Sequence, residues 1–178
     1  MKADEMTPKG LVDSLKKEFS GKLKDIRIET HKSGSKKTEY SHVWVTIDRK
    51  DYKALVKHLF TLDKYPHFPV SSGYDLGDTI NIVNHFTLFY GVRGREVSLN
   101  ITVSLPKSDP VIDTITDLIP GALISEQEKQ EMLGIKVKGI PKDQRVFISS
   151  DIPEGIYPWR KDETGAEAYA RNLHEVKK

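Results

Sequence analysis

Apolar residues recur along this chain with two spacings, one typical of amphipathic helices and one typical of half-buried strands. The helical spacing predicts two helices in the first third, over about residues 8–20 and 49–60. Thr7 and Pro8 favour a helix start, and Asp48 is placed to cap the second helix. The apolar positions of these helices are Leu11, Val12, Leu15, Phe19, Tyr52, Leu55, Val56, Leu59 and Phe60.

Alternation of apolar and polar residues predicts strands over residues 26–29, 42–47, 80–88 and 97–105. Glycines at both ends of residues 91–94 favour a hairpin between the last two strands. Residues 63–77 contain two prolines and two glycines. We therefore interpret that segment as a loop with a short edge strand around Val70.

Two further helices are predicted, one from Asp109-Pro110 to Pro120 and an acidic one from Gly121 to Leu133, where Gly134 stops it. Beyond Gly134, prolines prevent long regular elements, although Arg145–Ile148 fits a short strand. The order of elements predicts an α+β fold, with a mostly antiparallel sheet and helices packed on one face. We expect a core domain over residues 1–135 and an extended C-terminal docking arm and polar tail over residues 136–178.

Composition excludes several classes of function. The chain has 178 residues, a net charge of +2 and no cysteine, so disulfides, thiolate metal sites, cysteine-ligated iron–sulfur clusters and a thiol nucleophile are excluded. Its positive and negative charges are interspersed, unlike those of a dedicated nucleic-acid binder. Neither a membrane span nor a secretory signal is apparent, and we expect a cytoplasmic protein.

The acidic helix offers candidate chemistry in Glu126, Glu128 and Glu131. Glu128 and Glu131 share a helical face, which permits an acid/base pair or a metal site, but equally an exposed acidic surface. Glu126 interrupts the apolar stripe of the helix, so we expect it to meet a lysine or arginine of this chain or of a partner. No two histidines have helical metal-ligand spacing.

A second unusual segment follows about twenty residues later, and its residues are Tyr157, Pro158, Trp159, Arg160, Lys161 and Asp162. Tyrosine, tryptophan and arginine dominate the energetics of protein interfaces. Two interpretations remain open. Either this segment becomes ordered on a partner, or it folds back on its own sheet.

These two segments resemble motifs of the 30-kDa subunit family of respiratory-chain NADH dehydrogenase, the enzyme known as complex I. The first motif corresponds to Glu126-Gln-Glu-Lys-Gln-Glu-Met-Leu-Gly-Ile135, preceded by Pro120-Gly-Ala122, and the second to Pro158–Asp162. Two positions depart from the family pattern: its arginine is Gln127 here, and a later histidine is Ile140. The short length and charge-rich composition look most like the versions in archaeal membrane-bound hydrogenases and sulfur-reducing complexes.

The resemblance implies a subunit without cofactor or catalytic residues. Such a subunit supports the peripheral arm of a complex I-related membrane-bound oxidoreductase, on the cytoplasmic face. The implied partners are a large catalytic subunit of quinone or [NiFe] type and a small iron–sulfur subunit. The implied docking residues are the three glutamates and Tyr157–Asp162. The alternatives are an α+β module that binds RNA or a small ligand, with Trp44, Phe89 and Tyr90 as a stacking platform, and a hydrolase with paired glutamates.

Overall fold

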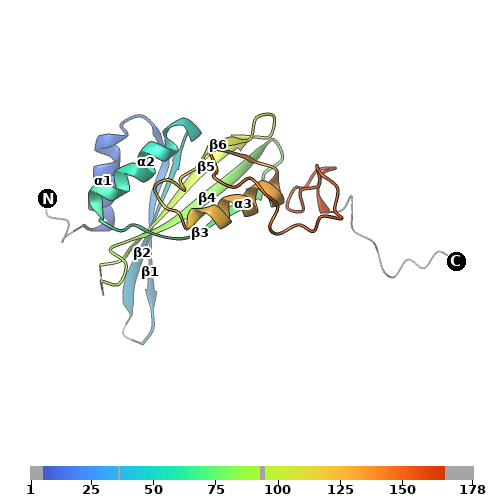
Figure 1. Cartoon of the computed structure of the whole chain (residues 1–178). Coiled ribbons are helices and arrows are strands. Elements are labelled where there is room, and N and C mark those ends of the chain that lie inside the picture. The colour runs from blue at the N-terminus through green and yellow to red at the C-terminus, as the bar shows by residue number, and fades with distance from the viewer. Residues whose placement is uncertain (1–5, 36, 93–94, 167–178) are drawn as a thin grey trace.

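The alternating segments of the sequence form one five-stranded sheet, and helices cover one of its faces (Figure 1). The computed structural model describes residues 6–35, 37–92 and 95–166. Its elements in chain order are α1 (Pro8–Glu18), β1 (Leu23–Ser33), β2 (Thr38–Ile47), α2 (Arg49–Leu62), β3 (His67–Asp75), β4 (Thr79–Leu88), β5 (Val97–Pro106), β6 (Val111–Asp113), α3 (Ala122–Leu133) and β7 (Lys136–Lys138).

The strand order in the large sheet is β1-β2-β5-β4-β3. Every neighbouring pair is antiparallel except β2 and β5, which run parallel. The connection between these two strands contains α2, β3 and β4, and is therefore long enough for a parallel pair. The small strands β6 and β7 pair in parallel as a separate sheet. These observations confirm the predicted α+β class and the mostly antiparallel sheet.

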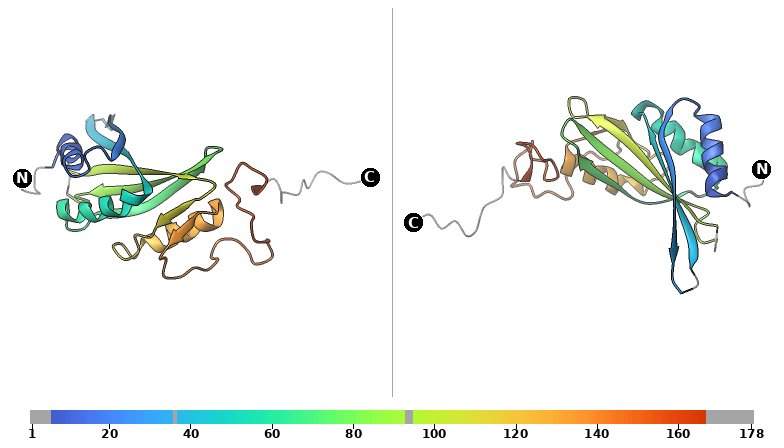
Figure 2. Two further views of the ribbon diagram at one scale, coloured as in Figure 1. Left: turned by 90° about the horizontal axis from the view of Figure 1, so that it is seen from above. Right: turned by 180° about the vertical axis from the view of Figure 1, so that it is seen from behind.

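The alternation of side chains decides which face of the sheet is buried. On β2, Val43, Val45 and Ile47 are at most 1% exposed, and they join one hydrophobic core with both N-terminal helices and α3. The residues between them, such as Trp44 and Thr46, lie on the other face and are partly exposed. The sheet therefore has a covered apolar face and an open polar face. Figure 2 shows the arrangement of its strands and helices from above and from behind.

The structure extends one sequence-based assignment and overturns another. The edge strand expected around Val70 is present, but β3 is nine residues long and takes up most of the segment interpreted as a loop, with Pro69 in an irregularity of the pairing between His67 and Val70. An edge strand tolerates proline there because its outward amide has no partner to lose. The predicted helix after Pro110 is absent from the described residues, since Val111–Asp113 pairs with β7 instead.

The segment after β7 forms no further α-helix or strand as far as residue 166. Within this described part, the short strand expected at Arg145–Ile148 is replaced by bends. The predicted polar tail lies largely outside the described residues. None of the helices that the structure describes has the length and apolar character needed to cross a membrane.

Candidate docking site

The C-terminal end of α3 is where the two unusual sequence segments meet. Gly134 ends the helix in the left-handed conformation, with φ of +64°. A side chain at this position would place its Cβ within 2.6 Å of the Tyr157 ring. Glycine is therefore required twice, once for the backbone turn and once for the close approach of the ring.

The loop Tyr157–Gly165 supplies hydrogen-bond donors to α3. A helix leaves its last carbonyls without partners inside the helix. Here the Trp159 amide donates to Met132 O at 2.9 Å, and the Arg160 side chain donates to Leu133 O at 2.7 Å and to Gly134 O at 3.3 Å. The guanidinium also stabilises the end of the helix electrostatically, because a cation is favoured at the negative, C-terminal end of the helix dipole.

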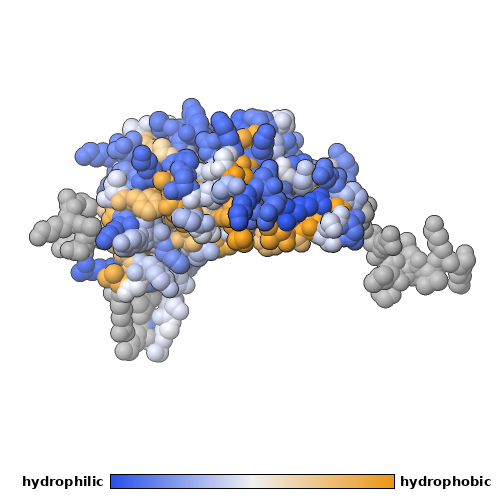
Figure 3. All heavy atoms as spheres, viewed as in Figure 1, coloured by the Kyte–Doolittle hydropathy of each residue, from blue (hydrophilic) through white to orange (hydrophobic). Residues whose placement is uncertain are grey.

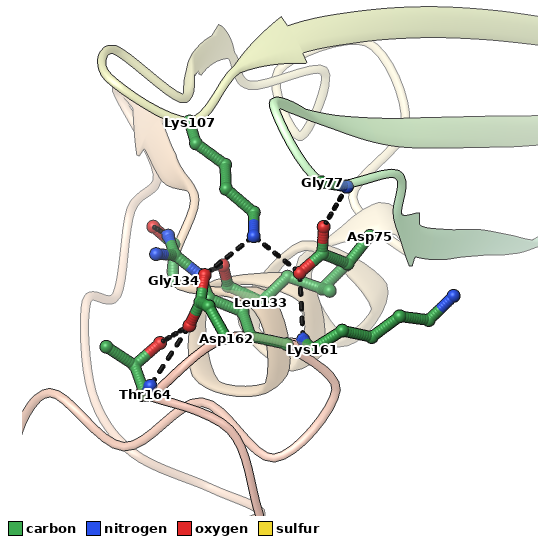
Figure 4. Close-up of polar contacts among 9 residues, drawn as sticks. Asp75, Gly77, Lys107, Leu133, Gly134, Lys161, Asp162 and Thr164 are labelled. Carbon is green, nitrogen blue, oxygen red and sulfur yellow. Dashed lines mark hydrogen bonds and ion pairs between the residues drawn. The ribbon is translucent and has the colours of Figure 1, made fainter.

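A partly buried ion network fastens the same loop to the sheet (Figure 4). Lys107, just after β5, contacts Asp75 Oδ2 at 2.7 Å and Asp162 Oδ2 at 2.6 Å. Asp75, at the end of β3, also accepts from the Lys161 amide at 2.8 Å, and its side chain is fully buried. Asp162 in turn accepts from the amide and hydroxyl of Thr164. The network joins the ends of two strands to the loop.

This arrangement shifts the ionisation of all three groups. Burial opposes the charge of Asp75, but the Lys107 ammonium and two backbone amides outweigh it and hold the pKa of that carboxyl below its usual value. Lys107, followed by Thr164, lowers the pKa of Asp162 strongly. Burial opposes the charge of Lys107 too, yet Asp162 and Asp75 raise its pKa. All three groups are therefore charged at neutral pH.

Glu131 anchors a second stretch of the same segment. It is only 8% exposed, and its carboxylate accepts from the amides of Val146, Phe147 and Ile148 at 2.6–2.8 Å. A carboxylate that accepts several amide bonds is a strong anchor, because each bond is charge-assisted. The predicted exposed acidic face is therefore not continuous, since one of its members binds this chain's own backbone.

Two glutamines on α3 also hold the segment that follows the helix by hydrogen bonds. Gln127 is buried and donates to the Lys142 carbonyl at 2.9 Å. Gln130 donates to Asp143 at 2.9 Å and accepts from the Val137 amide at 2.8 Å. The position where the resemblance calls for an arginine is therefore an internal contact, and its neutral amide suits a carbonyl partner.

The remaining glutamates have different surroundings. Glu128 is partly exposed and pairs with Lys129, a lysine only 1% exposed whose Nζ lies 5.3 Å from the centre of the Trp159 ring. Trp159 itself is 42% exposed. The tryptophan thus contacts the lysine of a partly buried ion pair through its ring and remains partly exposed to solvent.

Glu126 has neutral partners rather than the basic residue that we expected within this chain. Its carboxylate accepts from the Thr114 hydroxyl at 2.5 Å and the Ile115 amide at 2.8 Å. Burial raises the pKa of Glu126 despite these donors, and burial together with the Glu126 charge raises the pKa of Tyr52 well above its usual value. A basic partner from another chain stays a prediction.

Of the predicted docking residues, the structure brings Glu131, Tyr157, Trp159, Arg160 and Asp162 to one place, with Glu128 at its border. Sequence reasoning missed Asp75, Lys107 and Lys129. The first two lie at strand ends far apart in sequence, and only the sheet topology brings them together. Among the described residues, no group of three or more histidine, aspartate or glutamate side chains is arranged to hold a metal ion.

Comparison with known proteins decides the family. The model of the respiratory-chain NADH dehydrogenase 30-kDa subunit matches residues 45–169, which include both motifs. The chain belongs to this family. It is 39% identical over 141 residues to membrane-bound hydrogenase subunit beta of Pyrococcus furiosus, and the match covers 79% of this chain and 78% of that protein.

More distant relatives of this family member include longer proteins. It is 23% identical over 127 residues to formate hydrogenlyase subunit 5 of Escherichia coli, which covers 68% of this chain but only 22% of that protein. Among solved structures, a chain of the archaeal membrane-bound sulfane sulfur reductase matches with a TM-score of 0.67 at 13% identity, over 95% of this chain and 96% of that one. A trypsin-resistant fragment of Nqo5 matches with a TM-score of 0.58 at 21% identity, over 77% of this chain and 99% of that one. These two likenesses show a shared fold.

The geometry gives the family motifs a physical meaning in this member. The acidic helix motif ends at Gly134, and the Pro158–Asp162 motif lies directly on that end. Each motif supplies what the other lacks, since the helix offers carbonyls and a glycine gap while the loop offers donors and a ring. The two motifs therefore form one structural unit.

Proposed function

We propose that this chain is a non-catalytic structural subunit of the peripheral arm of a complex I-related membrane-bound oxidoreductase, of the hydrogenase or sulfur-reducing type. In this role it docks on the large catalytic subunit and its small iron–sulfur neighbour, on the cytoplasmic face, and supports electron transfer without holding a redox centre. The observation that carries the proposal is 39% identity to a membrane-bound hydrogenase subunit along most of both chains.

The arrangement of the loop supports a docking role. Backbone and charged groups of Tyr157–Asp162 are used internally to fix the loop on α3, whereas the Trp159 side chain stays 42% exposed. Val146 and Phe147, 48% and 42% exposed, stand on the stretch that Glu131 anchors. The result is a set of large apolar side chains on a preorganised backbone, which lowers the entropy cost of binding.

The surface around this unit has the same character. Figure 3 shows hydrophobic residues gathered along the lower edge of the molecule near α3, with mostly hydrophilic residues along the upper edge. Ile124 on α3 is 54% exposed. Exposed apolar residues beside a polar rim are typical of protein interaction sites.

The alternative RNA-binding platform is not assembled. Phe89 packs against the hydrophobic core, on the opposite side of the sheet from Trp44. Tyr90 is 63% exposed, but its ring stacks on His67 with ring centres 4.3 Å apart. The three aromatic residues therefore do not share one surface on which successive bases could stack.

Co-purification from cells that express the whole complex tests the proposal. Tagged wild-type chain should retain a large subunit with metal-ligand cysteines and a small iron–sulfur subunit. Trp159→Ala should reduce their yield about tenfold or more, as truncation of an interface anchor does. Tyr65→Ala provides the matched control, because Tyr65 is an aromatic residue 71% exposed on the α2–β3 connection.

The proposal fails if the wild-type chain retains neither subunit, or if the purified chain alone shows an optical or paramagnetic redox signal. Equal yields from Trp159→Ala and Tyr65→Ala would remove Trp159 from the interface and leave the subunit role standing. Thermal unfolding of each variant shows whether a lower yield reflects lost folding instead of lost contact.

A further inference from the structure

The β1–β2 hairpin extends well beyond the body of the sheet. β2 pairs with β5 only from His42 to Thr46, whereas β1 and β2 continue to pair as far as Ser33 and Thr38. The outer part, residues 28–41, therefore has no third strand from Thr30 to Ser41. Only at its base, where Ile28 and Glu29 pair with Val43 and His42, does β5 continue the sheet. Figures 1 and 2 show this two-stranded ribbon projecting from the sheet, at the end of the molecule away from the Tyr157–Gly165 loop.

A free ribbon of this kind requires an explanation, because two strands without a covering layer are marginally stable in water. The pairing is regular from Arg27 to Ser33. Ile28, which faces the covered side in sequence alternation, is 41% exposed. Nothing in the described part of the chain packs over the ribbon, so its stability and its exposed apolar surface both favour a partner.

One face of the ribbon carries a row of rings. His31 stacks on Tyr40 across the strands with centres 5.5 Å apart, and His42 meets both rings edge-on at 5.7 and 5.5 Å. Next along the same face, Arg27 lies over Trp44 at 5.1 Å. Cross-strand aromatic pairs rigidify a ribbon, and tyrosine, tryptophan and arginine are the usual anchors of interfaces.

The charges indicate what kind of surface fits. Both acidic residues of the ribbon are neutralised internally, since Glu29 pairs with Arg27 at 3.1 Å and Glu39 with Lys32 at 3.0 Å. Between residues 27 and 44 the sequence has four basic and two acidic residues, a net charge of +2. Lys37, at the turn, forms no ion pair with any described residue. An acidic surface complements this tip.

We infer that the ribbon of residues 28–41 is a second docking surface, whose occupant is an acidic face of a neighbouring protein subunit. The inference rests on the proposed function. A protein is favoured over a nucleic acid because His31, Tyr40 and His42 contact one another, which leaves few open ring faces for bases. With the loop at the other end of the molecule, the ribbon would hold the chain at two separated points.

The test compares three variants of the full chain in the expressed complex. Tyr40→Ala removes the centre of the ring row, Lys37→Glu reverses the charge at the tip, and Tyr65→Ala is the exposed aromatic control. Tyr40→Ala and Lys37→Glu should each lower the co-purified subunits about tenfold, with the control unchanged. Because Lys37→Glu removes no packed side chain, it keeps the inference testable if Tyr40→Ala fails to fold.

Two results would overturn the inference. One is that Tyr40→Ala and Lys37→Glu both match the control while the wild type retains its partners, which leaves the proposed function intact. The other is that the variants assemble normally but lose binding to labelled oligouridylate or to phosphatidylserine vesicles. A wild type that retains no partner at all would instead reject the proposed function and the inference with it.

Discussion

At the scale of single residues, Gly134 is the position where a one-carbon change has the clearest consequence. Gly134→Ala places a side chain on a left-handed backbone, which costs about 1–2 kcal/mol. It also drives a Cβ into the Tyr157 ring, where overpacking costs about 1–3 kcal/mol more. We expect a lower free energy of unfolding in urea and faster proteolysis of residues 139–166.

Gly21→Ala separates these two effects. Gly21 also has a positive φ, +73°, but a Cβ there would meet no atom within 4 Å. The two variants should share the backbone cost, and only Gly134→Ala should displace the loop. Equal proteolysis rates for both variants would contradict the contact between Gly134 and Tyr157.

At the scale of elements, the Asp75–Lys107–Asp162 network couples the Tyr157–Gly165 loop to the sheet. The packing of this loop on its own sheet should therefore depend on pH. Both aspartates have lowered pKa values, so their stabilisation is complete above about pH 4 and is lost as the pH falls through their folded pKa values. Lys107 has a raised pKa, so its contribution is complete below about pH 10 and is lost at higher pH.

We therefore expect the loop contacts to be fully stabilised from about pH 4 to 10, to weaken progressively outside that range, and to be lost only once the pH passes the shifted pKa values. Trp159 fluorescence reports the release in a Trp44→Phe background, which leaves one tryptophan. Asp162→Asn should shift release into milder acid. Asp117→Asn, which removes an exposed ion pair with Lys53, should not. Acid profiles that coincide for Asp162→Asn and Asp117→Asn would refute the coupling.

Elements with a complete local pattern could be predicted from the sequence. The strand at 97–105 was predictable because every second residue is apolar, the strand at 80–88 because only Asn84 interrupts that pattern, and α3 because Gly134 gives a clear stop. β3 was predictable only as a short edge strand around Val70, since Pro69 and Gly73 favour a loop locally. Gly73 is instead needed because a Cβ there would lie 2.5 Å from Leu133 on α3. Such packing between elements produces no recognisable pattern in the local sequence.

At the scale of the whole molecule, the candidate site was predictable in its parts but not in its assembly. The sequence identifies Glu131, Trp159 and Arg160 as unusual residues. It does not show that a carboxylate on α3 binds the following segment, or that Asp75 and Lys107 approach Asp162. Those contacts depend on which strands are neighbours, and the parallel pairing of β2 with β5 is not encoded by any local pattern.

A truncation after Lys138 tests whether the segment beyond β7 stabilises the core. This cut keeps β7 paired with β6 but removes the amides that bind Glu131, the Arg160 donors to α3 and the Asp162 partner of Lys107. Because hydrogen bonds to charged groups are worth about 1.5–3 kcal/mol each and the freed groups regain water, we expect a net loss of about 2–4 kcal/mol. Circular dichroism should still show the sheet. As a control, a chain that ends at residue 166 should have the same free energy of unfolding in urea as the full chain. If the chain that ends at Lys138 were also equally stable, the loop contacts would contribute no net stability to the core.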